Sequence, residues 1–132
     1  MRGKYLAAIA LVAGSAVALS AQAPRPPGST RTDLQRHDLS IPGWEVLQAR
    51  VDFAPGARFP AHRHPGEEII YVLSGTLEYE LEGQPPVTLE AGDVLFVPTG
   101  VFHSARNLGT TRGSELATYV IEKGKPLTEF AE

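Results

Sequence analysis

Turn-forming residues divide most of the chain into short segments, and this spacing constrains the fold more than any other feature of the sequence. From Pro42 onward, Gly or Pro clusters recur about every eight to twelve residues, and the chain holds 13 Gly and 11 Pro among its 132 residues. No segment between these breaks shows a persuasive 3.6-residue apolar period. The sequence therefore predicts an all-β domain of about eight short antiparallel strands, arranged as a sandwich or barrel.

Alternating side chains identify the individual strands. The clearest case is residues 77–82, where Leu77, Tyr79 and Leu81 alternate with three glutamates. Residues 44–53 show the same period of two, which is the signature of a half-buried strand. Ordered structure is expected to begin near Ile41. Further extended segments are predicted at residues 59–64, 67–73, 87–89, 94–97, 103–108 and 115–122.

The N-terminal segment, residues 1–23, is typical of a signal peptide for export. Two cations precede an apolar run from Leu6 to Leu19, and small residues follow it. Cleavage after Ser20 or after Ala23 fits these small residues. An uncleaved membrane anchor is the less favoured alternative, because the run is shorter than the ~20 residues needed to cross a bilayer. We therefore predict an exported protein, periplasmic or secreted, that does not associate with the membrane once the signal is cleaved.

The remaining chain is expected to contain one domain with a short extension at each end. Residues 24–40 are rich in Pro, Arg, Gly, Ser and Thr, which is typical of a linker or N-terminal arm, and His37 within them is expected to be a surface residue. Residues 41–126 are long enough for a single core, and residues 127–132 would form a C-terminal tail. The chain has no cysteine, so neither disulfides nor thiol chemistry contribute.

The charge of the chain argues against two classes of partner. The whole chain has 12 Lys and Arg against 15 Asp and Glu, and cleavage of the signal peptide would remove two of the cations. No stripe of basic residues is present that would suit a nucleic acid or an anionic membrane. A small-molecule ligand is therefore the expected partner.

Three of the four histidines fall in the stretch from His62 to His103. His62 and His64 are two residues apart in an extended segment, so their side chains face the same way, and the Pro65-Gly66 corner can return Glu68 toward both. Two imidazoles and one carboxylate suit a divalent first-row metal, and His103 on a later strand would add a third nitrogen. The alternative is that these histidines face solvent and the adjacent glutamates form a charged turn.

Two stretches around these residues resemble the two sequence motifs of the cupin family. All ten motif positions carry the expected residue types, and the motifs with the 16-residue spacer between them cover 52 residues. The first motif is Gly56, five residues, His62, one residue, His64, three residues, Glu68, six residues and Gly75. The second motif is Gly92, five residues, Pro98, one residue, Gly100, two residues, His103, three residues and Asn107.

The resemblance implies a single double-stranded β-helix, the jelly-roll barrel of the cupins, in which the two motifs meet on a metal ion. Carried onto this chain, the metal ligands are His62, His64, Glu68 and His103, and the cofactor is a divalent transition metal: Fe, Mn, Ni, Cu or Zn. Asn107 is expected to bond to loops rather than to the metal. The motif glycines are expected at turns that need positive φ or close approach.

The leading functional hypothesis is an enzyme that resembles the small quercetin-dioxygenase-like cupins. Glu68 would then be both a metal ligand and the general base. The alternatives are a periplasmic module that binds or senses a metal or small molecule without turnover, and a metal-dependent isomerase or lyase that uses the same base. The cavity walls are expected to be apolar and aromatic, with Phe96 or Phe102 among them, and without the cluster of Arg or Lys that a phosphorylated sugar or dicarboxylate would need.

Both faces of the strand at residues 67–73 are apolar, so its outer face should also be covered. Ile70 and Val72 share the inward side with Glu68. Ile69, Tyr71 and Leu73 point outward and need another partner. We expect a homodimer to provide this cover. A loop or the N-terminal arm would be an alternative.

Overall fold

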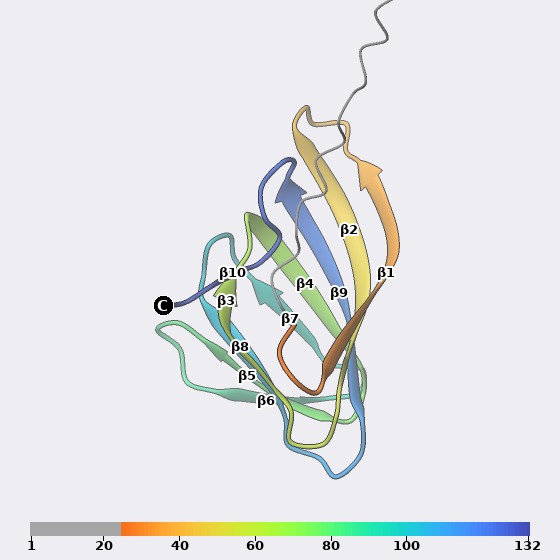
Figure 1. Ribbon diagram of the computed structural model, residues 1–132, viewed down its shortest axis with the longest axis vertical. Helices are drawn as coiled ribbons and strands as arrows, with labels where there is room; N and C mark the ends of the chain where they lie inside the picture. Colours follow the sequence, from red (N-terminus) through yellow and green to blue (C-terminus); the bar gives the residue numbers. More distant parts are fainter. Residues whose placement is uncertain (1–24) are drawn as a thin grey trace, which may run out of the picture.

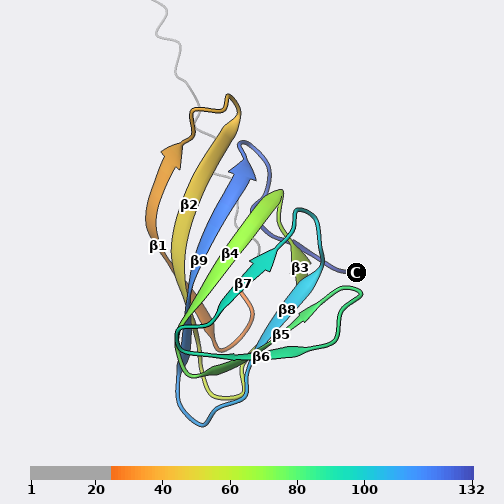
Figure 2. The ribbon, with the colours of Figure 1, turned by 180° about the vertical axis from the view of Figure 1, so that it is seen from behind.

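The computed structural model describes residues 25–132, which form two facing antiparallel sheets of five strands each (Figures 1 and 2). No helix occurs in this part of the chain, and none of its segments is therefore a membrane-spanning helix. The all-β jelly-roll prediction is confirmed, while the predicted signal peptide at residues 1–23 lies outside the described residues. The strands are β1 (Ser29–Asp38), β2 (Trp44–Phe53), β3 (Arg58–Arg63), β4 (Gly66–Ser74), β5 (Thr76–Leu81), β6 (Val87–Glu90), β7 (Val94–Val97), β8 (His103–Asn107), β9 (Gly113–Glu122) and β10 (Glu129–Phe130).

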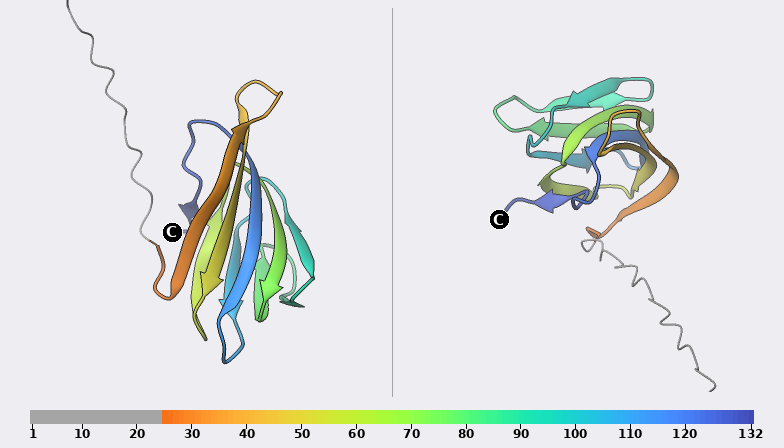
Figure 3. Two further views of the ribbon diagram at one scale, coloured as in Figure 1. Left: turned by 90° about the vertical axis from the view of Figure 1, so that its right-hand side faces the viewer. Right: turned by 90° about the horizontal axis from the view of Figure 1, so that it is seen from above.

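The chain crosses repeatedly between the two sheets. The first sheet has the order β1-β2-β9-β4-β7, and the second has the order β10-β3-β8-β5-β6. Consecutive strands such as β3 and β4, or β7 and β8, therefore belong to different sheets, and the view from above in Figure 3 shows the sheets as two layers. This arrangement places side chains from distant parts of the sequence opposite one another in the interior.

The core fills the space between the sheets because side chains alternate along each long strand. In β4, for example, Ile70 and Val72 are buried, whereas Ile69, Tyr71 and Leu73 are exposed on the outer face, as the sequence predicts. Each large apolar side chain buried in this way contributes about 1.5–3 kcal/mol. The core residues are Leu47, Ala49, Val51, Phe53, Ile70, Val72, Leu77, Tyr79, Leu81, Leu89, Val97, Ala105, Ala117, Tyr119 and Ile121.

The N-terminal arm differs from its prediction. The sequence predicts a linker over residues 24–40, but Ser29–Asp38 form β1 and pair with β2 from Ser29↔Phe53 to Asp38↔Glu45 (Figure 3). This strand has no apolar alternation, because most of its side chains on both faces are polar and exposed. Backbone hydrogen bonds to the edge of β2 hold it in place. His37 is exposed, as predicted.

The C-terminal tail also belongs to the barrel. Glu129 and Phe130 pair with Arg63 and His62 on β3, where the sequence predicts a tail over residues 127–132 (Figure 1). Phe130 stacks on Phe59 with ring centroids 5.8 Å apart. A two-residue strand carries too short a pattern to be recognised in a sequence, so only these tertiary contacts reveal it.

Two glycines allow the backbone geometry around the candidate site. A Cβ atom on Gly66 would lie 2.0 Å from the carbonyl oxygen of Val120, so only glycine lets β4 begin this close to β9. Gly75 ends β4 with φ of 82°, a conformation that other residues rarely adopt. The other motif glycines predicted at turns also have positive φ.

Candidate metal centre and cavity

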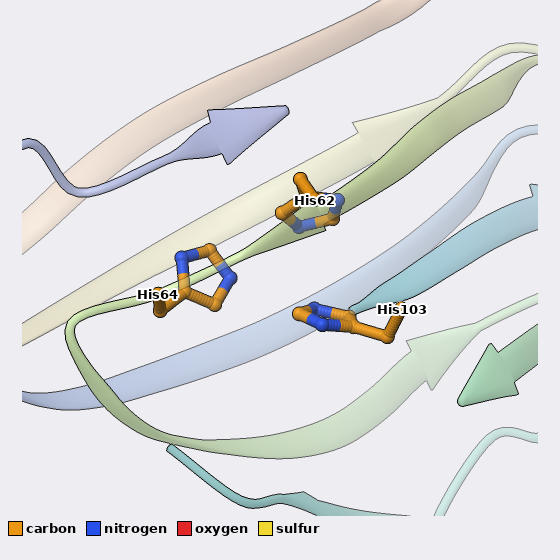
Figure 4. A group of neighbouring side chains, drawn as sticks. All are labelled: His62, His64 and His103. Carbon is orange, nitrogen blue, oxygen red and sulfur yellow. The ribbon is translucent and has the colours of Figure 1, made fainter. Parts of the chain in front are cut away.

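The structure brings together the four residues that the sequence singles out as metal ligands. One nitrogen from each of His62, His64 and His103 forms a group with all distances within 4.8 Å, and their rings converge in Figure 4. The Oε2 atom of Glu68 lies 2.9 Å from Nε2 of His103 and 3.3 Å from Nε2 of His64. All four residues are buried, with at most 7% of any of them exposed. The alternative of solvent-facing histidines is therefore wrong.

The two sheets supply opposite sides of this group. His62 on β3 and His103 on β8 are direct cross-strand partners in one sheet, and His64 follows immediately after β3. The Pro65-Gly66 corner returns Glu68 toward His64, as predicted, but it does not form a hairpin, because β3 and β4 lie in different sheets and do not pair. The corner at Pro65 instead carries the chain across the barrel, so the Glu68 carboxylate faces the imidazoles from the other sheet.

Backbone carbonyl groups fix the orientation of all three rings. Nδ1 of His62 lies 2.7 Å from the Pro60 oxygen, Nδ1 of His64 lies 2.6 Å from the Leu127 oxygen, and Nδ1 of His103 lies 3.0 Å from the Val101 oxygen. A carbonyl oxygen can only accept, so each Nδ1 carries a proton and donates it. In a neutral ring the lone pair is then on Nε2, directed into the site, which is how metal-binding histidines are held in proteins.

The members of the group change one another's pKa values. Burial raises the pKa of Glu68, but the hydrogen bond from His103 and the proximity of His64 outweigh it, so the pKa of this carboxyl is lowered and it is ionised. Burial and the neighbouring imidazoles lower the pKa of His62 to about 3, which keeps this ring neutral. Burial lowers the pKa of His103, but the contact with Glu68 more than compensates and raises it. A positive charge is thus favoured beside Glu68.

The donor atoms fit a divalent metal ion. Nε2 of His64 is buried and has no hydrogen-bond partner, although Glu68 Oε2 is 3.3 Å away. Neutral imidazoles at these distances would turn their lone pairs toward an anionic oxygen, an arrangement that needs a proton or a cation between them. Three nitrogens and one carboxylate oxygen form a ligand set that Fe, Mn, Ni, Cu and Zn accept.

A cavity of about 500 Å³ adjoins the four residues. Phe53, Phe59 and Ile70 supply apolar and aromatic wall, in agreement with the sequence prediction. Phe96 does not, because it is 55% exposed on the outer face of β7. The predicted absence of basic residues is wrong: Arg31 and three other cationic side chains also line this cavity.

A second buried carboxyl group lies in the cavity wall, at a residue that is not among those predicted for the site. Glu115 on β9 is 5% exposed and accepts a short hydrogen bond from the Tyr79 hydroxyl. Burial, together with the negative charge of Glu68, raises the pKa of Glu115 to about 8 against the opposing hydrogen bond from Tyr79. The carboxyl is therefore protonated at neutral pH. Its alternation with Ala117 and Tyr119 along β9 was the sequence signal for its inward position.

The prediction for Asn107 is confirmed. Asn107 holds loops together: its amide donates to the carbonyl oxygens of Phe53, Ala54 and Thr111, and its Oδ1 accepts from the Gly109 amide. Glu67 is half-buried outside the group of four, on the opposite face of β4 from Glu68.

Comparison with known proteins agrees with this architecture. A family model described as "Cupin domain" matches residues 49–121. The dimethylsulfoniopropionate lyase DddQ of Ruegeria pomeroyi is 44% identical over 63 residues, covering 47% of this chain and 31% of the lyase. The oxalate-binding protein of Thermotoga maritima is 38% identical over 76 residues, covering 57% of this chain and 62% of that protein. An oxalate oxidase structure in complex with the substrate analogue glycolate has a TM-score of 0.65 at 28% identity, covering 86% of this chain and 61% of the oxidase.

The chain therefore spans about a third of the lyase and less than two thirds of the other two proteins. The region that the family model matches, residues 49–121, contains all four residues of the candidate metal centre. The oxalate oxidase structure shares the fold over 86% of this chain.

Proposed function

The chain belongs to the cupin family, and on this premise we propose that it is an exported metal-dependent enzyme that acts on a small organic molecule. The observation that carries the proposal is the orientation of three buried histidines, each with Nδ1 bonded to a carbonyl oxygen and Nε2 directed into the site. His62, His64, His103 and Glu68 would hold the ion. When bound, such an ion supplies Lewis-acid polarisation of a substrate hydroxyl or carbonyl group.

The residues around the ion divide the acid and base roles between them. Glu68 is ionised, so it can accept a proton from the substrate while it also serves as a ligand. Glu115 is protonated at neutral pH and lines the same cavity, so it can donate one. Phe53, Phe59 and Ile70 limit the water that reaches the reacting atoms.

The first reaction type is a dioxygenase-like oxidation, which requires a redox-active metal and consumes O2. The second is a lyase or isomerase reaction that uses Glu68 as base without O2; the similarity to a lyase over 63 residues favours this candidate. The third is binding or sensing without turnover, favoured by the similarity to an oxalate-binding protein. In each case the same four residues hold the metal.

Elemental analysis and oxygen uptake test these alternatives. The full chain is purified from the exported compartment of an expressing bacterium, its metal content is measured, and oxygen consumption is followed with a catechol or a flavonol. Fe, Mn, Ni or Cu together with oxygen uptake supports the dioxygenase hypothesis, whereas zinc alone without oxygen uptake contradicts it. Product formation without oxygen uptake supports the lyase or isomerase hypothesis. Unchanged metal content in His62→Ala and His103→Ala would overturn the metal site itself.

We also propose a homodimer that covers the outer face of β4 and β7. Ile69, Tyr71, Leu73, Val94 and Phe96 are each between 42% and 65% exposed there, and the register places Ile69 opposite Phe96 and Tyr71 opposite Val94. Residues 29–38 do not cover this patch, because β1 lies at the other edge of the sheet. Sedimentation should give a dimer that Phe96→Lys converts to a monomer; a monomeric wild-type chain at all concentrations contradicts the proposal.

A further inference from the structure

Four cationic side chains line the cavity next to the candidate metal centre: Arg25, Arg31, Arg36 and Lys125. They come from β1 with the turn before it and from the segment after β9, so both ends of the described chain contribute. Three of the four are exposed, whereas the histidines are buried, which places the cations nearer the entrance of the cavity. A ligand that enters the barrel therefore passes basic side chains before it reaches the histidines.

Arg31 is the cation that the strand register directs into the barrel. Arg31 pairs with Val51 on β2, and Val51 pairs with Glu115 on β9. Directly paired residues of neighbouring strands point to the same face, and both Val51 and Glu115 are buried and line the cavity. The side chain of Arg31 is only 17% exposed, and Arg31 lines the cavity together with Val51 and Glu115.

Two of the other cations are held by acidic neighbours, and the third, Arg25, is exposed and donates to the backbone carbonyl oxygen of Arg31. Arg36 donates two hydrogen bonds, at 2.9 and 2.6 Å, to the buried carboxylate of Glu45. Lys125 lies 2.7 Å from Glu122. Nε of Arg31 is buried and lies 2.8 Å from Oδ1 of Asp33 without hydrogen-bond geometry, and Nη2 donates to Oδ2 of the same carboxylate at 3.5 Å. The Asp33 side chain is 46% exposed to water. Arg31 therefore keeps donors for another acceptor, since an ion pair with a solvated partner is weak.

Few acidic side chains in the cavity wall would compete with a ligand for the positive charge of Arg31. Two acidic residues, Glu68 and Glu115, line the cavity within residues 25–132. Glu68 is engaged with the imidazoles, and Glu115 is neutral at pH 7 because burial raises its pKa to about 8. The rest of the wall includes Phe53 and Phe59. A ligand with one anionic end and an apolar body matches these surroundings.

We propose that the ligand of the cavity is a small organic carboxylate and that Arg31 binds its carboxylate group. A guanidinium group can hold a carboxylate with two parallel charge-assisted hydrogen bonds, which fix orientation as well as charge. Arg31 would thus determine specificity, and the body of the ligand would extend toward the His and Glu group. This inference deepens the proposed function and rests on it for the reaction that follows binding.

Binding of matched carboxylates and amides tests the role of Arg31. Acetate, glycolate, benzoate and phenylacetate, and the amide of each, are titrated calorimetrically into the zinc-loaded full chain. At least one carboxylate should bind more tightly than its amide. In Arg31→Gln this carboxylate should lose about 10-fold or more in affinity while the affinity of the amide stays the same, because the lost hydrogen bonds are charge-assisted.

Arg50→Gln is the matched control, since Arg50 also lies beside an aspartate two residues later but is half-exposed outside the cavity. It should leave both affinities unchanged. A carboxylate preference that survives in Arg31→Gln, or no preference for any of the four pairs in the wild type, overturns the proposal. The metal-dependent function and carboxylate binding by Arg31 can fail separately, and titration of the metal-free chain tells them apart. If the wild type binds no zinc but still prefers the carboxylate in an Arg31-dependent way, the proposed function is wrong and this inference stands.

Discussion

Glu68 and Glu115 occupy the same inner face of one sheet and are buried to nearly the same extent, 2% and 5% exposed, yet they carry opposite protonation states. Glu68 faces histidines of the second sheet, and their contacts lower its pKa in spite of its burial. Glu115 faces the hydroxyl of Tyr79, whose hydrogen bond does not offset the effects of burial and of the Glu68 charge, so the pKa of Glu115 rises to about 8. Burial alone would protonate both carboxyls, so the strand across the barrel decides which of them keeps a charge.

The register keeps the two environments apart. Glu68 is paired with Tyr119, which is four residues beyond Glu115 on β9, a separation of about 13 Å along a strand. The cavity therefore has an anionic position beside the imidazoles and a neutral, proton-bearing position further along the same wall. One carboxyl is suited to hold a cation or accept a proton, and the other is suited to donate one.

Glu68→Gln should have the largest effect, because it removes the only charged ligand of the group. A four-ligand zinc site supplies roughly 10–16 kcal/mol, so the loss of one ligand should lower metal affinity by about 100- to 1,000-fold. Competition titration with a chelator measures this change. Glu67→Gln, on the other face of β4, is the control and should bind metal like the wild type; equal losses in both variants would contradict a specific role for Glu68.

Glu115→Gln should instead stabilise the fold at neutral and alkaline pH. The folded pKa of about 8 exceeds the unfolded value of about 4.3, so the contribution of Glu115 is complete below pH 4 and is lost as the pH rises through 8. The slope is at most about 1.4 kcal/mol per pH unit, so between the unfolded pKa of about 4.3 and pH 7 the wild type should lose about 4 kcal/mol of this contribution.

Urea unfolding of the wild type and of Glu115→Gln between pH 4 and pH 9 measures this difference in stability. The gap in unfolding free energy should widen up to about pH 8, because the Glu115 carboxyl of the wild type ionises in the unfolded chain while it stays protonated in the fold, and a glutamine does neither. A constant gap between the two proteins over this range would show that Glu115 is ionised in the fold, like Glu68.

Truncation after Pro126 should weaken the metal centre without changing the environment of Glu115. It removes the Leu127 carbonyl that holds His64, and the loss of such a supporting contact typically costs about 10- to 100-fold in metal affinity. A chain that ends at Phe130 retains this contact and is the control. If both truncated chains bind metal equally, the C-terminal segment does not orient His64.

Tyr79→Phe should have the smallest effect, a loss of about 1 kcal/mol in unfolding free energy at pH 7, because it removes one buried hydrogen bond. It should also raise the pKa of Glu115 further, since the hydroxyl of Tyr79 lowers it. The carboxyl stretching band in difference infrared spectra reports this pKa directly. Tyr71→Phe, on the exposed face, should alter neither quantity.

Much of the interior could be predicted from the sequence because its signals are local. Alternation identified the inner faces of β2, β4 and β5, and the spacing of His62, His64, Glu68 and His103 matched a known family. The strand β1 could not be predicted in this way. Its side chains are polar on both faces, and its position is set by backbone hydrogen bonds to β2, so the cavity-lining role of Arg31 stayed hidden.

By itself, the sequence determined the fold class and the identity of the four candidate ligands, because periodicity, turn chemistry and motif spacing are properties of short stretches. Only the tertiary structure decided that Glu68 meets the histidines from the opposite sheet, that Leu127 orients His64, and that Glu115 carries a proton. The physical reason is that a pKa and a ring orientation depend on what lies across the barrel. Leu127 and His64, or Glu115 and Tyr79, are neighbours there although tens of positions separate them along the chain.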